Sequence, residues 1–407
     1  MTRTDVAVTG LGLLTPAGVG VAATWERVCA GLPTAAPDPE LADVPVPFSC
    51  RVPAFDPRAV IGPQVWRMDR FVHLAIAAAL EAVADARLGP GAWDGARVGV
   101  VVGVGSDSKE TCLRSGERFL NHDYEGVSPL TVPRGTVNAA AGEIGIALQA
   151  LGPSLVVSTA CASGATALGV ARDLLLARRC DVVLAGGAEA PCHPFNSVCF
   201  SRMGALSTRV HDPAGASRPF DADRDGFVLA EGAGILVMER PEDARARRAP
   251  VHALLAGYGA STDGHHYAAA HPKGAGVERA CDAALADAGI GYADVDHINA
   301  HGTSTPMNDR IEGETLHRLF GGHPPAVTST KGVTGHTLGA AGAIEAALSV
   351  LTLQDQVIPP TANLDRLDPR IELDVVAKVP RPARLDVVAS NSFGFGGHNA
   401  VLIMRRA

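Results

Sequence analysis

Short apolar runs that end at glycine alternate along the chain with longer segments of helical periodicity. Two such runs, residues 96–103 and 181–187, are rich in β-branched residues, which indicates strands buried within a sheet. Phe71 to Ala86 is rich in alanine and has the apolar period of a helix. A further run, Ser154–Val157, predicts a buried strand that leads into a helix over residues 165–177. The pattern therefore predicts an α/β fold.

Chain length predicts two linked halves. With 407 residues, 47% of them hydrophobic, the chain exceeds the roughly 250–300 residues at which one hydrophobic core stops growing. A charged stretch bounded by prolines at residues 241–250 marks the expected seam. We therefore expect an N-terminal half over residues 1–245 and a C-terminal half over residues 246–407.

A short internal echo also suggests that the halves are similar. Val-Ser-Thr at residues 157–159 and Thr-Ser-Thr at residues 328–330 each stand at an expected strand end, before a helix rich in glycine and alanine. Matches this short arise by chance, so the echo supports duplication only together with chain length. The Pro- and Ala-rich residues 31–57 predict an irregular insertion on the surface.

Cys161 stands where the predicted strand Ser154–Val157 meets the predicted helix. The unpaired amides and positive dipole end of a helix start favour a thiolate, and such settings lower a cysteine pKa from about 8.5 to roughly 3.5–7.5. The small residues around the thiol leave room for an acyl group. A single cysteine is more often a core residue, but the strand–cysteine–helix context favours a nucleophile.

Two of the 14 histidines stand in unusual surroundings. His301 follows an apolar run that ends at Asn299 and lies among turn-prone polar residues, as expected at the tip of a strand. His336 lies between Gly335 and a segment of small residues, 337–342, which permits close backbone packing where a helix opens. Neither setting is typical of a solvated histidine. One thiol and two imidazoles are the groups that an acyl transferase forming carbon–carbon bonds needs.

In their order and spacing these motifs resemble those of the β-ketoacyl-acyl-carrier-protein synthases of the elongating Cys-His-His type. The resemblance covers nearly the whole chain, from residues 7–12 to residues 391–399. It implies a thiolase-like fold, five αβαβα layers built from two similar halves. It also implies that Cys161 accepts the growing acyl chain as a thioester, while His301 and His336 hold the malonyl thioester carbonyl during decarboxylation.

The resemblance further implies that three charged residues support the site, namely Lys331, Asp309 and Glu345. Lys331 is one of only four lysines beside 31 arginines, and a compact ammonium fits a tight polar pocket where a guanidinium does not. Glu345 interrupts the apolar run 340–347, which favours a buried partner. A charged residue such as Asp309 is more often simply solvated.

Other residues receive roles from the resemblance alone. Phe395, between two glycines, would be a gate that moves as the acyl chain enters, and its amide would form an oxyanion hole with that of Cys161. Thr303 and Thr305 would contact the pantetheine arm, and Phe200 would line the acyl pocket. The substrates would be carried on the phosphopantetheine arm of an acyl carrier protein, so we expect no separate cofactor.

The net charge of −8 argues against binding to nucleic acid or acidic membranes. Acyl carrier proteins are themselves acidic, so docking needs a local basic patch. Arg67 and Arg70 lie where the family commonly presents lysine and arginine, although ordinary solvated arginines are an equal alternative. The resemblance also implies either a homodimer or a heterodimer with a chain-length partner.

No sequence feature points to a nucleotide, a metal or a membrane. The pairs Gly10–Gly12 and Gly103–Gly105 do not complete a dinucleotide motif, and the eight cysteines are scattered, as expected of reduced thiols. Cys192 and Cys199 lack the second ligand pair of a metal site. The chain has no secretory signal and no apolar run of roughly 18–20 residues. We expect a cytoplasmic protein.

Alternative functions on the same fold are distinguished by single residues. A thiolase uses a second cysteine near its C-terminus, and here none follows Cys281. Initiating ketosynthases use Cys, His and Asn, and non-catalytic chain-length subunits typically replace the cysteine. A thioester hydrolase or a non-elongating acyltransferase is harder to exclude. Residues 199–200 and 224–232 look more like polyketide enzymes, whereas residues 391–399 suit fatty-acid elongation equally well, and we favour a polyketide pathway slightly.

Overall fold

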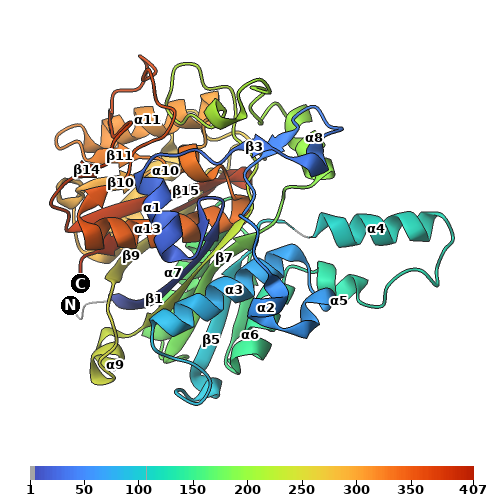
Figure 1. Cartoon of the computed structure of the whole chain (residues 1–407). Helices are drawn as coiled ribbons and strands as arrows, with labels where there is room; N and C mark the ends of the chain where they lie inside the picture. Colours follow the sequence, from blue (N-terminus) through green and yellow to red (C-terminus); the bar gives the residue numbers. More distant parts are fainter. Residues whose placement is uncertain (1–4, 107) are drawn as a thin grey trace.

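Strands from both halves of the chain form one mixed sheet system in the computed structural model, which describes residues 5–106 and 108–407 (Figure 1). The strand order is β13-β11-β10-β15-β16-β9-β1-β8-β7-β5-β6, with β2 paired to β1. The strands of the first half are β1 Val6–Thr15, β2 Gly18–Val19, β5 Val98–Gly103, β6 Ser154–Val157, β7 Val182–Glu189 and β8 Gly232–Glu239. Those of the second half are β9 Ala253–Thr262, β10 His297–Asn299, β11 Ala326–Thr328, β13 Asp374–Val375, β15 Val387–Gly394 and β16 His398–Arg405.

One five-strand arrangement occurs twice. In the first half β1 pairs antiparallel with β8 and β8 with β7, while β7, β5 and β6 run parallel. In the second half β9 pairs antiparallel with β16 and β16 with β15, while β15, β10 and β11 run parallel. The two sheets join where Val6–Val8 of β1 pair with β9. The prediction of two similar halves, including the echo before two corresponding helices, is confirmed.

Helices complete five layers. The helix α3 (Arg70–Asp85) covers the outer face of the first sheet, and α10 (Ala275–Ala288) covers the second. Between the sheets, α7 (Ser163–Leu176) packs against α13 (Ala341–Asp355). Because α13 is enclosed on both sides, its residues from Ala341 to Leu353 are all buried, which explains its apolar composition. The family-derived expectation of an αβαβα fold is thus confirmed.

Two glycines let the central helices approach each other. A Cβ atom on Gly164 would lie 2.7 Å from the backbone nitrogen of Ala343, and one on Gly342 would lie 2.8 Å from that of Ala165. Any larger residue at either position would force the helix starts apart. The two halves make equivalent contacts, since Gly164 approaches the start of α13 as Gly342 approaches the start of α7. These contacts bring together the two segments that precede these helices, and these segments carry Cys161 and His336.

The remaining elements include α6 (Ala139–Leu148), which packs beside α3, and α11 (Pro306–Phe320), which packs beside α10. The small strands are β3 Ala36–Pro37, β4 Phe48–Ser49, β12 Val357–Ile358 and β14 Arg381–Pro382. The other α-helices are α1 Val21–Cys29, α2 Pro57–Ile61, α4 Lys109–Leu120, α5 Thr131–Gly135, α8 Pro194–Arg202, α9 Pro241–Ala246 and α12 Lys331–Thr334. The helix α9 lies between β8 and β9, where the repeat changes over, and the division at residues 245 and 246 stays a prediction.

Most predicted elements form as expected, but two expectations are wrong. The strand Ser154–Val157 is not buried, because β6 is the last strand of the sheet, and Leu155 is 41% exposed. Residues 31–57 are not only a surface insertion. Their irregular backbone carries Phe48 and Cys50 into a buried cluster that also contains Cys161. The insertion therefore contributes to the hydrophobic cluster that includes Cys161.

Candidate active site

Cys161, His301 and His336 line one cavity of about 540 Å³. Each residue lies in a connection that leads into a helix. Cys161 lies between β6 and α7, His301 between β10 and α11, and His336 between α12 and α13. The parallel strands β10 and β11 end at the same edge of their sheet and bring the His301 and His336 segments together, and the contact between the starts of α7 and α13 places the Cys161 segment beside them. The structure thus brings together the three residues that the sequence singled out.

The Cys161 thiol is enclosed, with only 8% of the residue exposed. Burial raises its pKa to about 12, although the charge of Lys331 and the backbone amides of Phe395 and of Cys161 itself act in the opposite direction. The expectation of a lowered thiol pKa is therefore wrong. Cys161 lies just before Ser163, the first residue of α7. Removal of the thiol from water raises its pKa more than the nearby positive groups lower it. In the resting site the cysteine is a thiol.

The two histidines face each other across the cavity. Their ring centroids lie 5.4 Å apart at an interplanar angle of 82°. Aromatic rings hold both of them: Phe227 lies 5.2 Å from the His336 ring and Phe393 lies 5.5 Å from the His301 ring. Burial and the nearby Lys331 charge hold the pKa of both imidazoles well below the ordinary value, so both rings are neutral.

Lys331 joins the histidine segments. Its Nζ atom donates a hydrogen bond of 2.6 Å to the backbone carbonyl of His301 and forms an ion pair with Glu345. All of these groups are buried. Burial raises the pKa of the Glu345 carboxyl to about 7, while Lys331 acts in the opposite direction. The two residues expected to support the site therefore form a pair directly behind His301.

Asp309 does not line the cavity. Its carboxylate instead binds backbone N–H groups of neighbouring segments. Its carboxylate is fully buried on the first turn of α11 and accepts the N–H groups of Phe220 (2.8 Å) and Ser304 (3.1 Å). One turn later on α11, Glu312 accepts the N–H groups of His301 and Gly302, each at 2.8 Å, a role that was not predicted from the sequence. The sequence did contain a signal for this role: Asp309 and Glu312 are acidic residues three positions apart, shortly after the turn that carries His301.

The residues assigned to the gate and the acyl pocket also line the cavity. Phe395 begins a short turn, η7 (Phe395–Gly397), in which Gly396 has a φ of 82°. A Cβ atom on Gly394 would lie 3.0 Å from the backbone nitrogen of Cys161, so only glycine allows this approach. The Phe395 ring lies 6.4 Å from that of Phe200. The aromatic turn thus stands directly beside the thiol.

Thr303 and Thr305 lie on the cavity wall that belongs to the His301 segment. Their hydroxyl oxygens are 2.9 Å apart, within hydrogen-bonding distance of each other. The Thr305 hydroxyl also accepts the N–H of Asn308 and so caps the start of α11. The pair offers polar groups along the cavity, as a role beside the pantetheine arm requires, and that role stays a prediction.

Arg67 and Arg70 are not free basic side chains. Arg67 donates to Glu143 at 2.9 Å, and Arg70 forms a bidentate pair with Glu231 at 2.6 and 2.7 Å. Neither arginine lines the cavity that contains Cys161. These pairs neutralise both guanidinium groups locally. The docking role therefore stays a prediction, and the two ion pairs weigh against it.

Comparison with known proteins identifies the family. The model of the β-ketoacyl synthase N-terminal domain matches residues 3–244, and that of the C-terminal domain matches residues 252–365. The chain belongs to the β-ketoacyl synthase family. A 3-oxoacyl-(acyl-carrier-protein) synthase 2 of Rhizobium meliloti (strain 1021) is 41% identical over 415 residues, which cover 98% of each chain. Like these ketosynthases, the chain is an acyltransferase.

Solved ketosynthase structures share the whole fold. The ishigamide ketosynthase/chain length factor superposes with a TM-score of 0.94 at 33% identity, covering 100% of both chains. AntDE:AntF, described as a type II polyketide synthase acyl-carrier protein in complex with its ketosynthase bound to the hexaketide, superposes with a TM-score of 0.91 at 30% identity, again over 100% of both chains. In the described part of this family member, no helix is long and apolar enough to cross a membrane.

Proposed function

We propose that the chain catalyses the decarboxylative Claisen condensation of an acyl chain held on Cys161 with malonyl-acyl-carrier protein, in polyketide or fatty-acid biosynthesis. The observation that carries this proposal is the single cavity lined by one thiol and two neutral imidazoles. A hydrolase needs no second imidazole to hold an enolate. The substrates arrive on the phosphopantetheine arm of the carrier protein, and the proposed reaction uses no further cofactor.

In the first half-reaction Cys161 takes the acyl group from its carrier protein. Because the thiol is protonated at rest, its proton leaves as the sulfur attacks, and the neutral imidazoles of the same cavity are available bases. The carbonyl oxygen becomes negative in the tetrahedral intermediate. The backbone amides of Cys161 and Phe395, which point at the sulfur, supply donors for it. Collapse releases the carrier thiol and leaves the thioester.

In the second half-reaction the malonyl group loses carbon dioxide. The electron pair of the broken carbon–carbon bond moves onto the thioester carbonyl and forms an enolate. The Nδ1 atoms of His301 and His336 are buried without a partner among the described residues, so Nε2 is the candidate donor of each ring. Two neutral N–H donors stabilise the enolate oxygen. Its α-carbon then attacks the acyl-cysteine, and the Cys161 sulfur leaves and takes up a proton.

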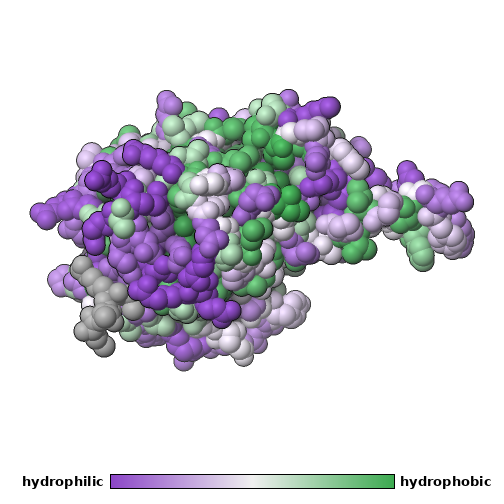
Figure 2. Space-filling model, turned by 90° about the horizontal axis from the view of Figure 1, so that it is seen from below, coloured by the Kyte–Doolittle hydropathy of each residue, from purple (hydrophilic) through white to green (hydrophobic). Residues whose placement is uncertain are grey.

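We propose that a second chain of the same fold binds the arm formed by α4 and the segment that follows it. The arm projects from the body of the molecule (Figures 1 and 2), and several large apolar side chains are exposed on it and on α5: Leu113, Phe119, Leu120, Tyr124 and Val132. The edge strand β6 adds backbone groups that a partner strand can pair with. The partner is either a second copy or a chain-length subunit. Sedimentation of the chain alone decides between them.

We place the protein in the cytoplasm, where its eight cysteines stay reduced. The central experiment incubates the purified protein with an acyl-carrier protein substrate and malonyl-carrier protein, and follows products by mass spectrometry. We expect a mass increase on Cys161 and a chain two carbons longer. Cys161→Ala is the matched control, in which loading and condensation disappear. Release of free acid without elongation would show a hydrolase instead.

A further inference from the structure

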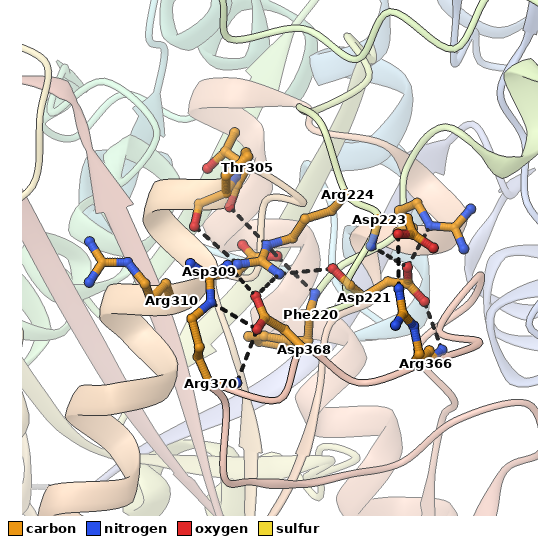
Figure 3. A network of polar contacts seen from close by, with 12 residues as sticks. Phe220, Asp221, Asp223, Arg224, Thr305, Asp309, Arg310, Arg366, Asp368 and Arg370 are labelled. Atoms are coloured by element: carbon orange, nitrogen blue, oxygen red, sulfur yellow. Dashed lines mark hydrogen bonds and ion pairs between the residues drawn. The ribbon is translucent and has the colours of Figure 1, made fainter.

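Arg224 is a buried arginine outside the cavity, with only 1% of its side chain exposed. Its guanidinium donates to the backbone carbonyls of Asp221 (2.8 Å), Thr305 (3.3 Å) and Pro306 (3.0 Å). It also forms ion pairs with Asp368 at 2.8 Å and Asp309 at 3.5 Å, as Figure 3 shows. One side chain therefore connects three segments that are far apart in the sequence.

The turn that Arg224 holds has an unfavourable backbone. Ser304 has a φ of 72°, in the left-handed region that residues other than glycine rarely adopt. Its N–H donates to Asp309 at 3.1 Å, its carbonyl accepts the N–H of Gly226 at 3.1 Å, and its hydroxyl accepts the N–H of Arg218 at 2.9 Å. Surrounding groups, rather than the turn itself, thus fix the conformation between Thr303 and Thr305.

Arg224 is suited to this position because of its shape and charge. Asp309 and Asp368 are both buried carboxylates, and a buried charge is stable only when it is paired. A planar guanidinium has five N–H groups and can serve two carboxylates and three carbonyls at once, whereas a lysine ammonium has three. Removing the guanidinium would leave Asp309 without its cation and the carbonyls of Thr305 and Pro306 without their donor.

The histidine on the same segment has a separate set of supports. Glu312 accepts the N–H groups of His301 and Gly302, and Lys331 binds the His301 carbonyl. Arg224 contacts neither His301 nor any of these three bonds. A change at Arg224 should therefore move the threonine end of the turn more than the histidine end.

We propose that Arg224 is a positioning residue for the carrier arm: it orients the hydroxyls of Thr303 and Thr305, and through them sets the binding of pantetheine-linked substrates rather than the chemistry at Cys161. The inference rests on the proposed function, because it takes the bound group to be the pantetheine arm. It concerns a residue that touches no substrate and acts only through the turn.

The test compares Arg224→Lys and Arg224→Gln with Arg370→Gln. Arg370 pairs with the same Asp368 but is 62% exposed, so it controls for loss of an ion pair in this cluster. For the Arg224 variants we expect KM for malonyl-carrier protein to rise about tenfold or more while kcat changes less than about threefold, as for lost uniform binding. Alkylation of Cys161 by iodoacetamide, which needs no arm, should keep its wild-type rate. Arg370→Gln should resemble wild type in all three measurements.

Each result has one meaning. Unchanged KM in folded Arg224 variants overturns the inference, and so does a fall in kcat with KM unchanged. If neither Arg224 variant folds, Asp368→Asn keeps the arginine but removes one of its anchors, and an unchanged KM in that variant overturns the inference as well. Failure of the wild-type protein to condense any substrate would instead overturn the proposed function.

Discussion

The Nζ atom of Lys331 lies 2.6 Å from the backbone carbonyl oxygen of His301. Lys331 is also the first residue of α12, the short helix that ends just before His336. A single ammonium thus joins the segments of both histidines, and Glu345 on α13 balances its charge. This connection adds to the parallel pairing of β10 with β11, which brings the segments of residues 301 and 336 together.

Replacing Lys331 with methionine should therefore damage the site in two ways. Loss of the cation leaves Glu345 as an unpaired buried charge, which costs roughly 3–5 kcal/mol of stability. It also raises the pKa of the Cys161 thiol further, since the Lys331 charge lowers it. We expect slower malonyl decarboxylation and slower alkylation of Cys161 at pH 8, measured on the same preparation.

The double variant Lys331→Met with Glu345→Gln is the control for stability. It removes the unpaired carboxylate, so its melting temperature should recover toward wild type while decarboxylation stays slow. Recovery of decarboxylation together with stability would mean that Lys331 acts only on folding. In that case its hydrogen bond to His301 would have no part in the reaction.

The role of the two histidines in decarboxylation should be separable from the role of the thiol in acylation. His301→Ala and His336→Ala each remove one candidate donor to the enolate, and loss of such a donor typically slows a reaction by about 10²–10³. Acylation of Cys161 should persist in both variants because the thiol and the amides of Cys161 and Phe395 remain. Release of labelled carbon dioxide from malonyl-carrier protein measures one step, and the mass of the acyl-enzyme measures the other. Normal decarboxylation in both variants would place the donors elsewhere.

Local sequence was sufficient to find the three segments that meet at the cavity. Cys161, His301 and His336 each stand between an apolar run and a segment rich in small residues, and that is the pattern of a strand ending before a helix. The repeat of the fold was visible for the same reason. Strand and helix periods depend on neighbouring residues, so a reader of the sequence can recognise them without knowing which elements meet.

The features that the sequence did not reveal all involve contacts between distant residues. Arg70 pairs with Glu231, 161 positions away, and no local pattern indicates that pairing. The Cys161 pKa was expected to fall because a helix follows, but the walls that exclude water come from residues near Cys50 and Phe227. The strand β6 is apolar, but it lies at the edge of the sheet, where this chain leaves Leu155 41% exposed. Burial is a property of the assembled fold.

Glu189 should make the fold less stable as pH rises. Its carboxylate is buried and accepts the N–H groups of Gly105 and Gly339 and the Ser106 hydroxyl. Burial nonetheless raises its pKa from the ordinary 4.5 to about 7. The folded state thus holds the proton more tightly than the unfolded chain, so the stabilisation is complete below pH 4.5 and is lost as pH rises through 7.

Urea unfolding at pH 5 and pH 8 measures this effect. The contribution of Glu189 is on the order of 3 kcal/mol. Glu345 acts in the same direction, because burial also raises its pKa to about 7. We expect Glu189→Gln to reduce the loss of stability between the two pH values but not to abolish it. An identical pH dependence in wild type and variant would show that Glu189 stays ionised in the folded protein.

The turn that carries Phe395 should move when Cys161 is acylated. Gly394 approaches the Cys161 backbone where no side chain fits, and Gly396 adopts a φ of 82°, so the turn has backbone freedom on both sides of the ring. Two backbone hydrogen bonds of 2.8 Å tie it to a neighbouring loop, one from the Gly396 N–H to the Tyr267 carbonyl and one from the Asp263 N–H to the Gly397 carbonyl. The Phe395 ring lies 6.4 Å from that of Phe200 and lines the same cavity as the two histidines.

Phe395→Ala should therefore fold normally and lose the order of the two substrates. With the ring gone, the histidine side of the cavity stays open, so malonyl decarboxylation without prior acylation should stay equal to wild type or rise. Long acyl chains should load poorly or indiscriminately, because no ring closes behind them. Single-turnover decarboxylation with free and acylated Cys161 measures the order directly. Crystal structures of both states provide the decisive comparison, and a Phe395 ring in the same place in both would make it part of the pocket wall and no gate.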